Sequence, residues 1–594
     1  MLRPAYRWRL PDPIDVPAEA IALGRSLGLS ERQVRLLAGR GHGPDALAAW
    51  VGRAEDGLHD PALLPDAGAV VERVGLARRR GERVLVFGDF DADGLTGLAV
   101  LSEALGDIGL DVDVHVPLRV ADGHGLSRRA VEDAAARRCS LIFTVDCGTA
   151  SGEEIAFAAG RGIDVIVTDH HHVPRRLPPA VAVVNPHRPD SVYPDRQISG
   201  AGVAFKVAQL LVSAAGHGGS HGGAASRVAL ELAELAAIGT VADVAPLVGE
   251  NRAIVRLGLE RLRGQPRPGL AALLARAGVA HQAVDVESLG YVIAPRLNAV
   301  GRLGDATVAA RLLLTRDPDE ARRLAQELEA ANAERRTLLA SALAEAREAL
   351  GVAGLPAEEA IVTVVGPWSP GIVGLVAGRL AEEHGRPAVV VSSEVSPWRA
   401  SARSAGGFDL AFAFEACADL LERHGGHRDA AGCTLAPHAW EPFRRRLGEL
   451  AAALDPLDRL PTLSVDLLLP AADVDYRLLR ELAVLEPSGP GNPPPLVAIT
   501  GLEVMRARVV QGGHSQLTLR KGLEVLDAIA FDRPDIAPAV EVGTRVDVVA
   551  RLASRAFGGY ESLQLEVRDV GPAGAGPAVG SPAGDPAVVV GPAG

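Results

Sequence analysis

The stretch Arg83–Gly97, which reads RVLVFGDFDADGLTG, decides the fold class of this chain. Its first six residues are almost all apolar, as in a strand that is buried on both faces of a sheet. Three aspartates, Asp89, Asp91 and Asp93, follow at alternate positions where this strand ends. In an open parallel sheet, ligands bind beyond the carboxyl ends of the strands. We therefore expect an α/β fold with a functional site at this strand end.

Further short apolar runs, separated by helical segments, continue this pattern to about residue 260 and predict a parallel sheet covered on both faces. The runs are Asp111–Val116, Leu141–Val145, Asp164–Thr168 and Val181–Val184. An Ala-rich charged stretch then predicts a long helix, a second α/β block follows, and β-branched runs between Gly turns predict a C-terminal barrel. The expected domains are an N-terminal helical extension (1–70), a core (71–304), a connecting helix (305–354), a smaller α/β domain (355–457), the barrel (458–570) and a low-complexity, disordered tail (571–594).

Hydrophobic residues make up 48% of the 594 residues and charged residues 23%, which is typical of folded globular proteins rather than disordered ones. The formal net charge of −13 argues against a protein that coats nucleic acid by bulk charge, although it allows a local basic groove. Lys206 and Lys521 are the only lysines, so arginines must make any phosphate contacts. The four cysteines form no CxxC pair, and no apolar run predicts a membrane span or a secretory signal. We therefore expect reduced thiols and a cytoplasmic protein without membrane contact.

Acidic and histidine clusters stand at several predicted strand ends, and the sheet topology should bring them together. After Asp89, Asp91 and Asp93 come TVDCG with Asp146, TDHHH with His170 and His171, and GTVAD with Asp243. Any one cluster alone would be more often a loop or a helix cap, but their combination favours a site. Carboxylates about 4 Å apart repel by several kcal/mol at a protein's effective dielectric, so such a cluster is tolerable only if some of them are protonated or if cations fill it. Oxygen and imidazole ligands suit Mn²⁺ or Mg²⁺, and two such ions can hydrolyse a phosphodiester.

Arginines in two later segments are candidates for phosphate binding. Arg296, Asn298 and Arg302 lie in a Gly- and Pro-broken segment just after the core, and Arg recognises phosphate in a bidentate manner. From the smaller α/β domain, Arg403 and the pair Gly426–His427 offer a cation and backbone N–H groups. The alternatives are a solvated loop for the first segment, and a turn followed by a core histidine for the second.

Several of these motifs resemble the DHH phosphoesterase family. GDFDADGLTG, TVDCG, TDHH and GTVADVAPLVGENR occur in the order that this family shows. The fuller string is similar to the bacterial RecJ branch of that family, through APRLNAVGRLGDA at Ala294–Ala306, SARSAGGFDL at Ser401–Leu410 and HGGHRDAAG at His424–Gly432. The resemblance implies a DHH core, a DHH-associated domain and an oligonucleotide-binding (OB-like) barrel.

The resemblance also implies roles for individual residues. Asp146 would bridge two Mn²⁺ or Mg²⁺ ions, and Asp89 would be either a further ligand or an acceptor behind the ligands. His171 would lie close to the reacting phosphate, as support for the ligands or as a donor to developing charge. The full set of expected metal ligands is Asp91, Asp93, Asp146, His170 and Asp243.

The function that the resemblance implies is a single-stranded-DNA-specific 5′→3′ exonuclease that releases 5′-mononucleotides in DNA repair and recombination. Single-stranded DNA would be the substrate, and a single-strand-binding protein and a helicase would be partners. Two alternatives stay open at this point. One is a DHH phosphodiesterase acting on short oligonucleotides or cyclic dinucleotides, and the other is a non-catalytic scaffold that binds single strands.

Overall fold

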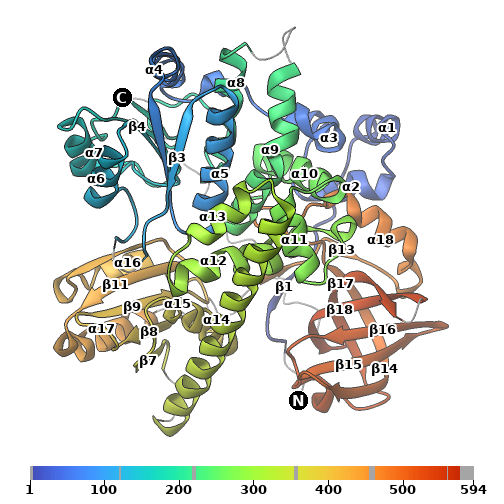
Figure 1. The fold of residues 1–594 in the computed structure, drawn as a ribbon. Coiled ribbons are helices and arrows are strands. Elements are labelled where there is room, and N and C mark those ends of the chain that lie inside the picture. Colours follow the sequence, from blue (N-terminus) through green and yellow to red (C-terminus); the bar gives the residue numbers. More distant parts are fainter. Residues whose placement is uncertain are drawn as a thin grey trace, which may run out of the picture. The chain divides into compact units, whose positions relative to one another are not determined.

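Five parallel strands in the order β3-β2-β4-β5-β6 form the sheet that carries the predicted site (Figure 1). The computed structural model describes residues 4–119, 122–216, 223–353, 359–453, 462–557 and 560–574, so most of the predicted tail lies outside it. The strands are β2 (Arg83–Gly88), β3 (Asp111–His115), β4 (Cys139–Val145), β5 (Asp164–Thr168) and β6 (Ala182–Val184). The expected parallel α/β core is confirmed. The strand order reverses between β2 and β4, the type of position where ligands bind in such sheets.

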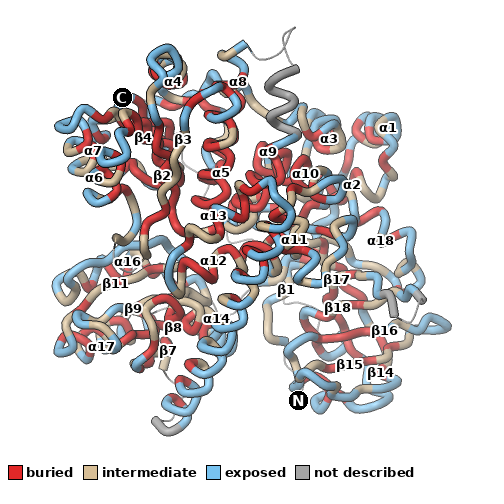
Figure 2. Tube along the Cα trace, viewed as in Figure 1, coloured by how far each residue is buried: buried red, intermediate tan, exposed pale blue. Residues whose placement is uncertain are grey.

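The central strands are largely buried (Figure 2), and alternate residues enter two different hydrophobic cores, which explains the near-continuous apolar runs. Val84 and Val86 face one core, while Leu85 and Phe87 face the other. The first core is covered by α4 (Ala67–Arg80), α5 (Ala92–Asp107), α8 (Gly200–Ala214) and α9 (Gly223–Ala242). The second core is covered by α6 (Arg128–Ala136) and α7 (Gly152–Ala159).

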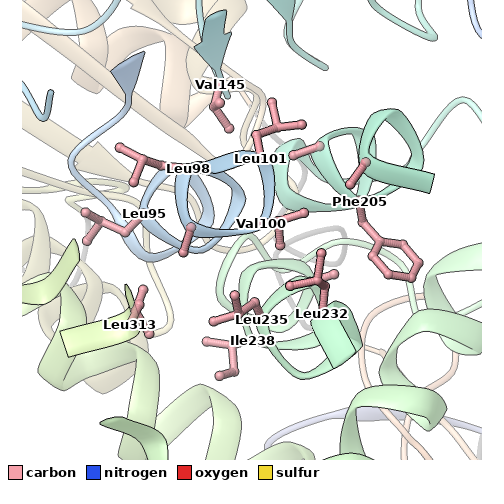
Figure 3. Close-up of a cluster of buried hydrophobic side chains, with 14 of the residues drawn as sticks. Leu95, Leu98, Val100, Leu101, Val145, Phe205, Leu232, Leu235, Ile238 and Leu313 are labelled. Carbon is pink, nitrogen blue, oxygen red and sulfur yellow. The ribbon is translucent and has the colours of Figure 1, made fainter. Parts of the chain in front are cut away.

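Helix α5 is the central element of the first core (Figure 3). Its Leu98 and Leu101 lie close to Val145 of β4, and side chains of α8 and α9 surround its other faces. Nearly every residue of α5 is buried, so the helix fixes the position of the aspartates that precede and begin it.

The residues after α9 fold into further helices of the same unit. They are α10 (Gly249–Gly264), α11 (Pro268–Arg276), the π-helical turn η4 (Ser288–Ile293), α12 (Ala294–Leu303), α13 (Thr307–Leu314) and α14 (Pro318–Ala353). Most of the range expected as a connecting helix, 305–354, is the long helix α14, but α14 starts only at Pro318, and residues Thr307–Leu314 form the separate helix α13. Asp317 accepts a hydrogen bond from the N–H of Asp319 at 2.9 Å, and Pro318 occupies the first helical position, so a new helix starts there.

A second, mixed sheet in the order β10-β11-β9-β8-β7 follows α14. Its strands are β7 (Val362–Gly366), β8 (Ala388–Ser392), β9 (Trp398–Arg403), β10 (Arg423–Gly426) and β11 (Ala430–Leu435). Only β7 and β8 pair in parallel, whereas β9, β11 and β10 continue antiparallel. The helices α15 (Val373–His384), α16 (Leu410–Glu415) and α17 (Trp440–Ala452) complete this smaller α/β domain.

The described residues within 1–51, 454–486 and 494–594 form a separate compact unit, and those within 52–453 and 487–493 form the unit described so far. The separate unit holds the predicted barrel, which closes because β14 pairs with both β15 and β17. The barrel strands are β14 (Val497–Val510), β15 (His514–Lys521), β16 (Glu524–Ala530), β17 (Arg545–Phe557) and β18 (Tyr560–Pro572).

The start of the chain belongs to the barrel unit rather than forming an extension of its own. Strand β1 (Arg7–Arg9) pairs in parallel with β12 (Thr462–Ser464), and the indole N–H of Trp50 donates to the carbonyl of Val484 at 2.8 Å. Helices α1 (Ala18–Ser26), α2 (Glu31–Gly39) and α3 (Pro44–Val51) share one hydrophobic core with the barrel strands. Within the described residues, no helix combines the length and apolarity that a membrane crossing requires.

Candidate metal centre

Asp146 lies at the centre of the acidic cluster and has an unusual backbone. It directly follows β4, its φ is +61°, and its side chain is buried. A left-handed conformation costs a non-glycine residue about 1 kcal/mol or more, and such strain concentrates at functional sites. A Cβ on Gly200, the first residue of α8, would lie 2.5 Å from Asp146 Oδ1. The backbone of α8 therefore confines this carboxylate from one side.

The three alternating aspartates are fixed by the strand-to-helix turn between β2 and α5. Asp91 is the N-cap of α5 and accepts hydrogen bonds from the N–H groups of Asp93 and Gly94, both at 3.1 Å. Asp93 points the other way and accepts from the N–H groups of Gly200 and Ala201 at 2.8 and 2.9 Å. Asp93 thus joins the start of α5 to the start of α8, and both helix N-termini face the cluster.

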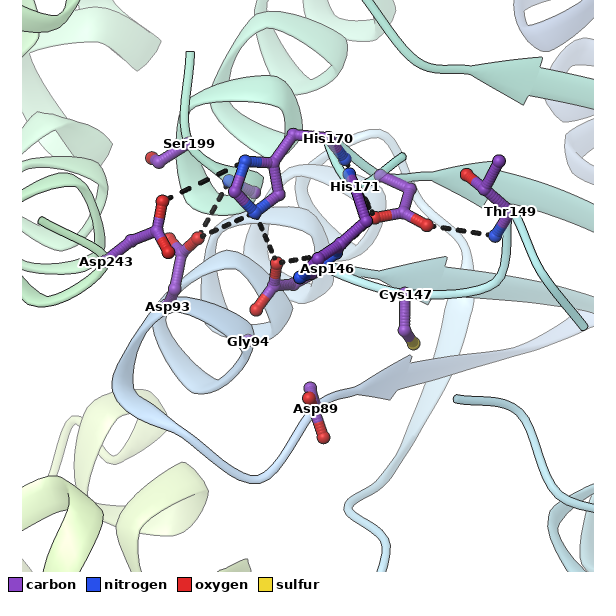
Figure 4. A network of polar contacts seen from close by, with 12 residues as sticks. Asp89, Asp93, Gly94, Asp146, Cys147, Thr149, His170, His171, Ser199 and Asp243 are labelled. Atoms are coloured by element: carbon purple, nitrogen blue, oxygen red, sulfur yellow. Dashed lines mark hydrogen bonds and ion pairs between the residues drawn. The ribbon is translucent and has the colours of Figure 1, made fainter. Parts of the chain in front are cut away.

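His170 connects three of the predicted carboxylates (Figure 4). Its Nε2 lies 3.0 Å from Asp146 Oδ1 and 3.9 Å from Asp93 Oδ2, and its Nδ1 lies 3.9 Å from Asp243 Oδ2. Asp243 follows the end of α9, whereas His170 follows β5, so residues far apart in sequence converge as expected. Possible ligand atoms lie within 4.8 Å of one another in three overlapping sets: Asp89, Asp91 and Asp146; Asp93, His170 and Asp243; and Asp146, His170 and His171.

His171 is held by Asp169, a residue that the sequence reasoning did not single out. Its Nδ1 lies 2.8 Å from Asp169 Oδ1, and the other oxygen of Asp169 accepts from the N–H of Thr149. The hydrogen bond to Asp169 raises the pKa of His171 to about 9. Burial acts in the opposite direction on Asp169, but the hydrogen bond from His171 still lowers the pKa of that carboxyl. Asp169 stands next to His170 at the end of β5, so the strand-end rule that located the other aspartates also indicates it.

The carboxylates of the cluster destabilise one another's charge. Burial and then the neighbouring carboxylates raise the pKa of Asp91 to about 6 and that of Asp243 to about 7. The same two causes raise the pKa of Asp146 well above its ordinary value, and burial raises that of Asp93. Buried anions in this number need compensating positive charge.

Two atoms of the cluster lack hydrogen-bond partners, and this tests whether a cation fits there. Asp146 Oδ1 and His170 Nε2 lie 3.0 Å apart, yet each is buried and has no hydrogen-bond partner among the described residues. Buried polar atoms are nearly always satisfied, so a shared partner is expected where both are directed. A divalent cation with oxygen and imidazole ligands meets this requirement, and the donor set fits Mn²⁺ or Mg²⁺.

Three arginines act on one another's charge near the acidic cluster, and the sequence reasoning found only two of them, Arg302 and Arg403. Burial, and then charges that include Arg119 and Arg403, lower the pKa of Arg302 to about 9. Burial and the charge of Arg119 also lower the pKa of Arg403. The charges of Asp89 and Asp91 act on Arg119 in the opposite direction, so Arg119 lies within electrostatic reach of the acidic cluster. Arg119 was missed, although it closely follows β3, the strand beside β2.

Other predicted substrate-binding residues have different partners in the structure. The segment with Arg296, Asn298 and Arg302 is helix α12, not a broken loop. Arg296 is paired with Glu329 of α14 at 2.6 Å, and Asn298 Oδ1 accepts from the N–H of Ala92 at 2.7 Å. Asn298 therefore braces the first turn of α5 in this structure.

Gly426 and His427 lie at the exposed end of β10 and in the turn after it. Gly426 has a φ of +141°, and a Cβ there would lie 2.4 Å from the carbonyl oxygen of Ala430, so the turn requires glycine. The N–H of His427 donates to the carbonyl of Ala430 at 2.8 Å, and in the part of the chain that the structure describes no hydrogen bond or ion pair links either residue to the acidic cluster.

Family models match three segments of the chain. They are the N-terminal domain of the DHH family at residues 83–240, the DHHA1 domain at residues 358–453 and the RecJ OB domain at residues 465–569. The first segment contains the central sheet and nearly all of the acidic cluster. The fold is therefore that of the DHH family.

Two curated relatives and two solved structures narrow this class. "Single-stranded-DNA-specific exonuclease RecJ" of Bacillus subtilis is 34% identical to this chain, and the match covers 96% of this chain and 71% of the relative. The protein of the same name from Thermus thermophilus is 38% identical, and the match covers 89% of this chain and 75% of the relative. Crystal structures of RecJ from Thermus thermophilus match with TM-scores of 0.78 in the Mn²⁺ complex and 0.73 in the Mg²⁺ complex, at 32% and 31% identity. These matches cover 95% of this chain and 79% and 78% of those chains, respectively. The chain belongs to the RecJ family, and it is a metal-dependent nuclease of the hydrolase class.

Proposed function

We propose that the protein is a single-stranded-DNA-specific exonuclease that removes 5′-mononucleotides in the 5′→3′ direction, in DNA repair and recombination. The observation that carries this proposal is the convergence of the acidic strand ends on Asp146 and His170, in a chain of the RecJ family. The names of the relatives support single strands as the substrate. The cytoplasm as the location, and a single-strand-binding protein and a helicase as partners, are part of the same proposal.

Two divalent cations, Mn²⁺ or Mg²⁺, would be held by Asp91, Asp93, Asp146, His170 and Asp243. Such ions supply Lewis acidity, which activates water and withdraws charge from a phosphodiester. The sets of possible ligand atoms support two cation sites rather than one. Asp146 belongs to one set with Asp89 and Asp91 and to another set with His170 and His171, so it could serve both sites. Asp89 would be either a further ligand or an acceptor behind the ligands, because its carboxylate belongs to one set with Asp91 and Asp146.

His171 would assist the reaction without binding a cation. Asp169 accepts from Nδ1, which leaves Nε2 as the second donor of the ring. The hydrogen bond to Asp169 also fixes the orientation of the ring, and Asn185 holds the backbone of His171 by donating to its carbonyl oxygen. A ring held in this way can donate a hydrogen bond to charge that develops on the phosphate in the transition state.

The three arginines Arg119, Arg302 and Arg403 would bind the phosphate at the 5′ end of the strand. Arg302 is half-buried, the charges of Arg119, Arg335 and Arg403 lower its pKa, and a bound phosphate would relieve their repulsion. A terminal phosphate that is anchored beside the cations would present the first phosphodiester bond for cleavage, which is why one nucleotide would leave at a time.

Product analysis tests this proposal. Single strands and duplexes labelled at either end are incubated with Mn²⁺ or with EDTA, and an Asp146→Asn variant serves as the inactive control. Release of mononucleotides from the 5′ end of single strands, with Mn²⁺ only, is the expected result. Cleavage of only very short or cyclic substrates, or binding without cleavage, would instead favour one of the two alternative functions.

A further inference from the structure

The loop after β3 places one histidine against the acidic cluster. His124 stands between Gly123 and Gly125, whose φ angles are +76° and +89°. Its side chain is 66% exposed, yet its Nδ1 lies 2.9 Å from Oδ2 of Asp89. Asp89 itself is buried and is the first of the three alternating aspartates. The imidazole of His124 therefore contacts a carboxylate of the candidate metal centre from the solvent side.

His124 completes the hydrogen bonding of Asp89. The other oxygen, Oδ1, accepts from the N–H of Phe90 at 2.8 Å. With one partner on each oxygen, the carboxylate cannot rotate freely about its terminal bond, and its remaining lone pairs have fixed directions. Asp89 shares a set of possible ligand atoms with Asp91 and Asp146, so its orientation bears on the cation that this set would hold.

Phe90 holds the imidazole in place. The ring centroids of Phe90 and His124 lie 4.6 Å apart, and the guanidinium of Arg119 lies 4.7 Å from the same Phe90 ring. Phe90 is 1% exposed, so it gives the histidine a rigid apolar support. The hydrogen bond to Asp89 and the contact with Phe90 together select one position for a side chain that would otherwise move in solvent.

We propose that His124 is a positioning residue of the metal centre, which orients Asp89 through its Nδ1–H and thereby strengthens cation binding. Hydrogen bonds behind the ligands of a metal commonly change its affinity by about 10- to 100-fold. The inference rests on the proposed function, because it requires that the acidic cluster binds divalent cations.

Calorimetric titration of the full-length protein with Mn²⁺, without DNA, tests the inference. Wild type is compared with His124→Ala, with His124→Gln, which keeps a donor, and with His438→Ala, an exposed histidine of the smaller α/β domain, as matched control. The expected result is a Kd for Mn²⁺ that rises about 10-fold or more in His124→Ala, rises less in His124→Gln and does not change in His438→Ala. The melting temperature in EDTA should be the same for all four proteins, since the side chain is mostly exposed.

The outcomes separate this inference from the proposed function. Binding of Mn²⁺ by wild type and by His124→Ala with equal Kd would overturn the role of His124 and leave the metal centre intact. If wild type itself binds no Mn²⁺, both fail. A lower melting temperature of His124→Ala in EDTA would indicate that His124 stabilises the fold. If His124→Gln then also failed to recover affinity for Mn²⁺, the positioning role would be overturned.

Discussion

Replacement of Asp243 by Asn should have opposite effects on stability with and without metal. The pKa of Asp243 rises from 3.8 to about 7 in the folded protein, a shift of about 3 units, which corresponds to about 4 kcal/mol at 1.36 kcal/mol per unit. The Asp243 side chain is 32% exposed, so solvent screening reduces this to about 1–2 kcal/mol.

The sign follows from the direction of the shift. Because the folded pKa lies above the unfolded value, the contribution of Asp243 to stability is complete below about pH 4 and is lost as the pH rises through about 7. At pH 8 in EDTA, Asp243→Asn removes a carboxylate that repels Asp93, so the variant should unfold a few degrees above wild type. At pH 4 the two proteins should unfold together.

Added Mn²⁺ should reverse this order. A cation that binds only the folded protein stabilises it by about 2.7 kcal/mol at 100 times its Kd, and the variant lacks one ligand, so it gains less. Thermal unfolding at pH 4 and pH 8, with EDTA or Mn²⁺, is the assay, and Asp107→Asn, an exposed aspartate at the end of α5, is the matched control. A variant that is less stable than wild type in EDTA at pH 8, or that gains as much from Mn²⁺, would refute the reasoning.

Three further predictions concern single positions. Asp146→Asn should abolish cleavage of end-labelled single strands without lowering the melting temperature in EDTA, because it removes a buried charge; residual turnover would contradict a central role for this carboxylate. Gly200→Ala should weaken Mn²⁺ binding in calorimetry, since its Cβ would lie 2.5 Å from Asp146 Oδ1, and unchanged affinity would show that the helix can retreat. Arg302→Ala should weaken binding of a 5′-phosphorylated strand and reduce the salt slope by about one, whereas Arg296→Ala, whose guanidinium is paired with Glu329, should change both less; the reverse order would locate the phosphate elsewhere.

The central sheet and its acidic strand ends could be predicted because their signals are local. The apolar run at Arg83–Gly88 and the aspartates after it lie within a dozen residues, and the geometry of parallel sheets brings such strand ends together. Partners across the fold have no local signal. The link between Asn298 and Ala92 spans 206 residues, so sequence reasoning described Asn298 only as a candidate for substrate binding.

The sequence also did not indicate that residues 1–51 belong to the barrel unit, because their partners lie far away along the chain. Strand β1 has three residues, and its register with β12 depends on a partner 455 residues away, as in the hydrogen bond from Arg9 to Ser464. No periodicity of residues 1–51 indicates that partner. The break before Pro318 was missed because the residues on both sides of it have high helix propensity. Only a few residues separate α13 from α14, and the hydrogen bond from the N–H of Asp319 to Asp317 at the start of α14 gives no strong sequence signal.

The pairing of β1 with β12 has a consequence during biosynthesis. Ribosomes add about 5–20 residues per second, so the start of the chain waits roughly 20–90 s for a partner strand that lies 455 residues downstream. During that interval Trp50 and the leucines of α2 have no barrel to cover them, and chaperones that recognise apolar segments can bind them on the nascent chain. Slow codons late in the message would lengthen this exposure, and circular permutation that joins the two terminal segments would abolish it.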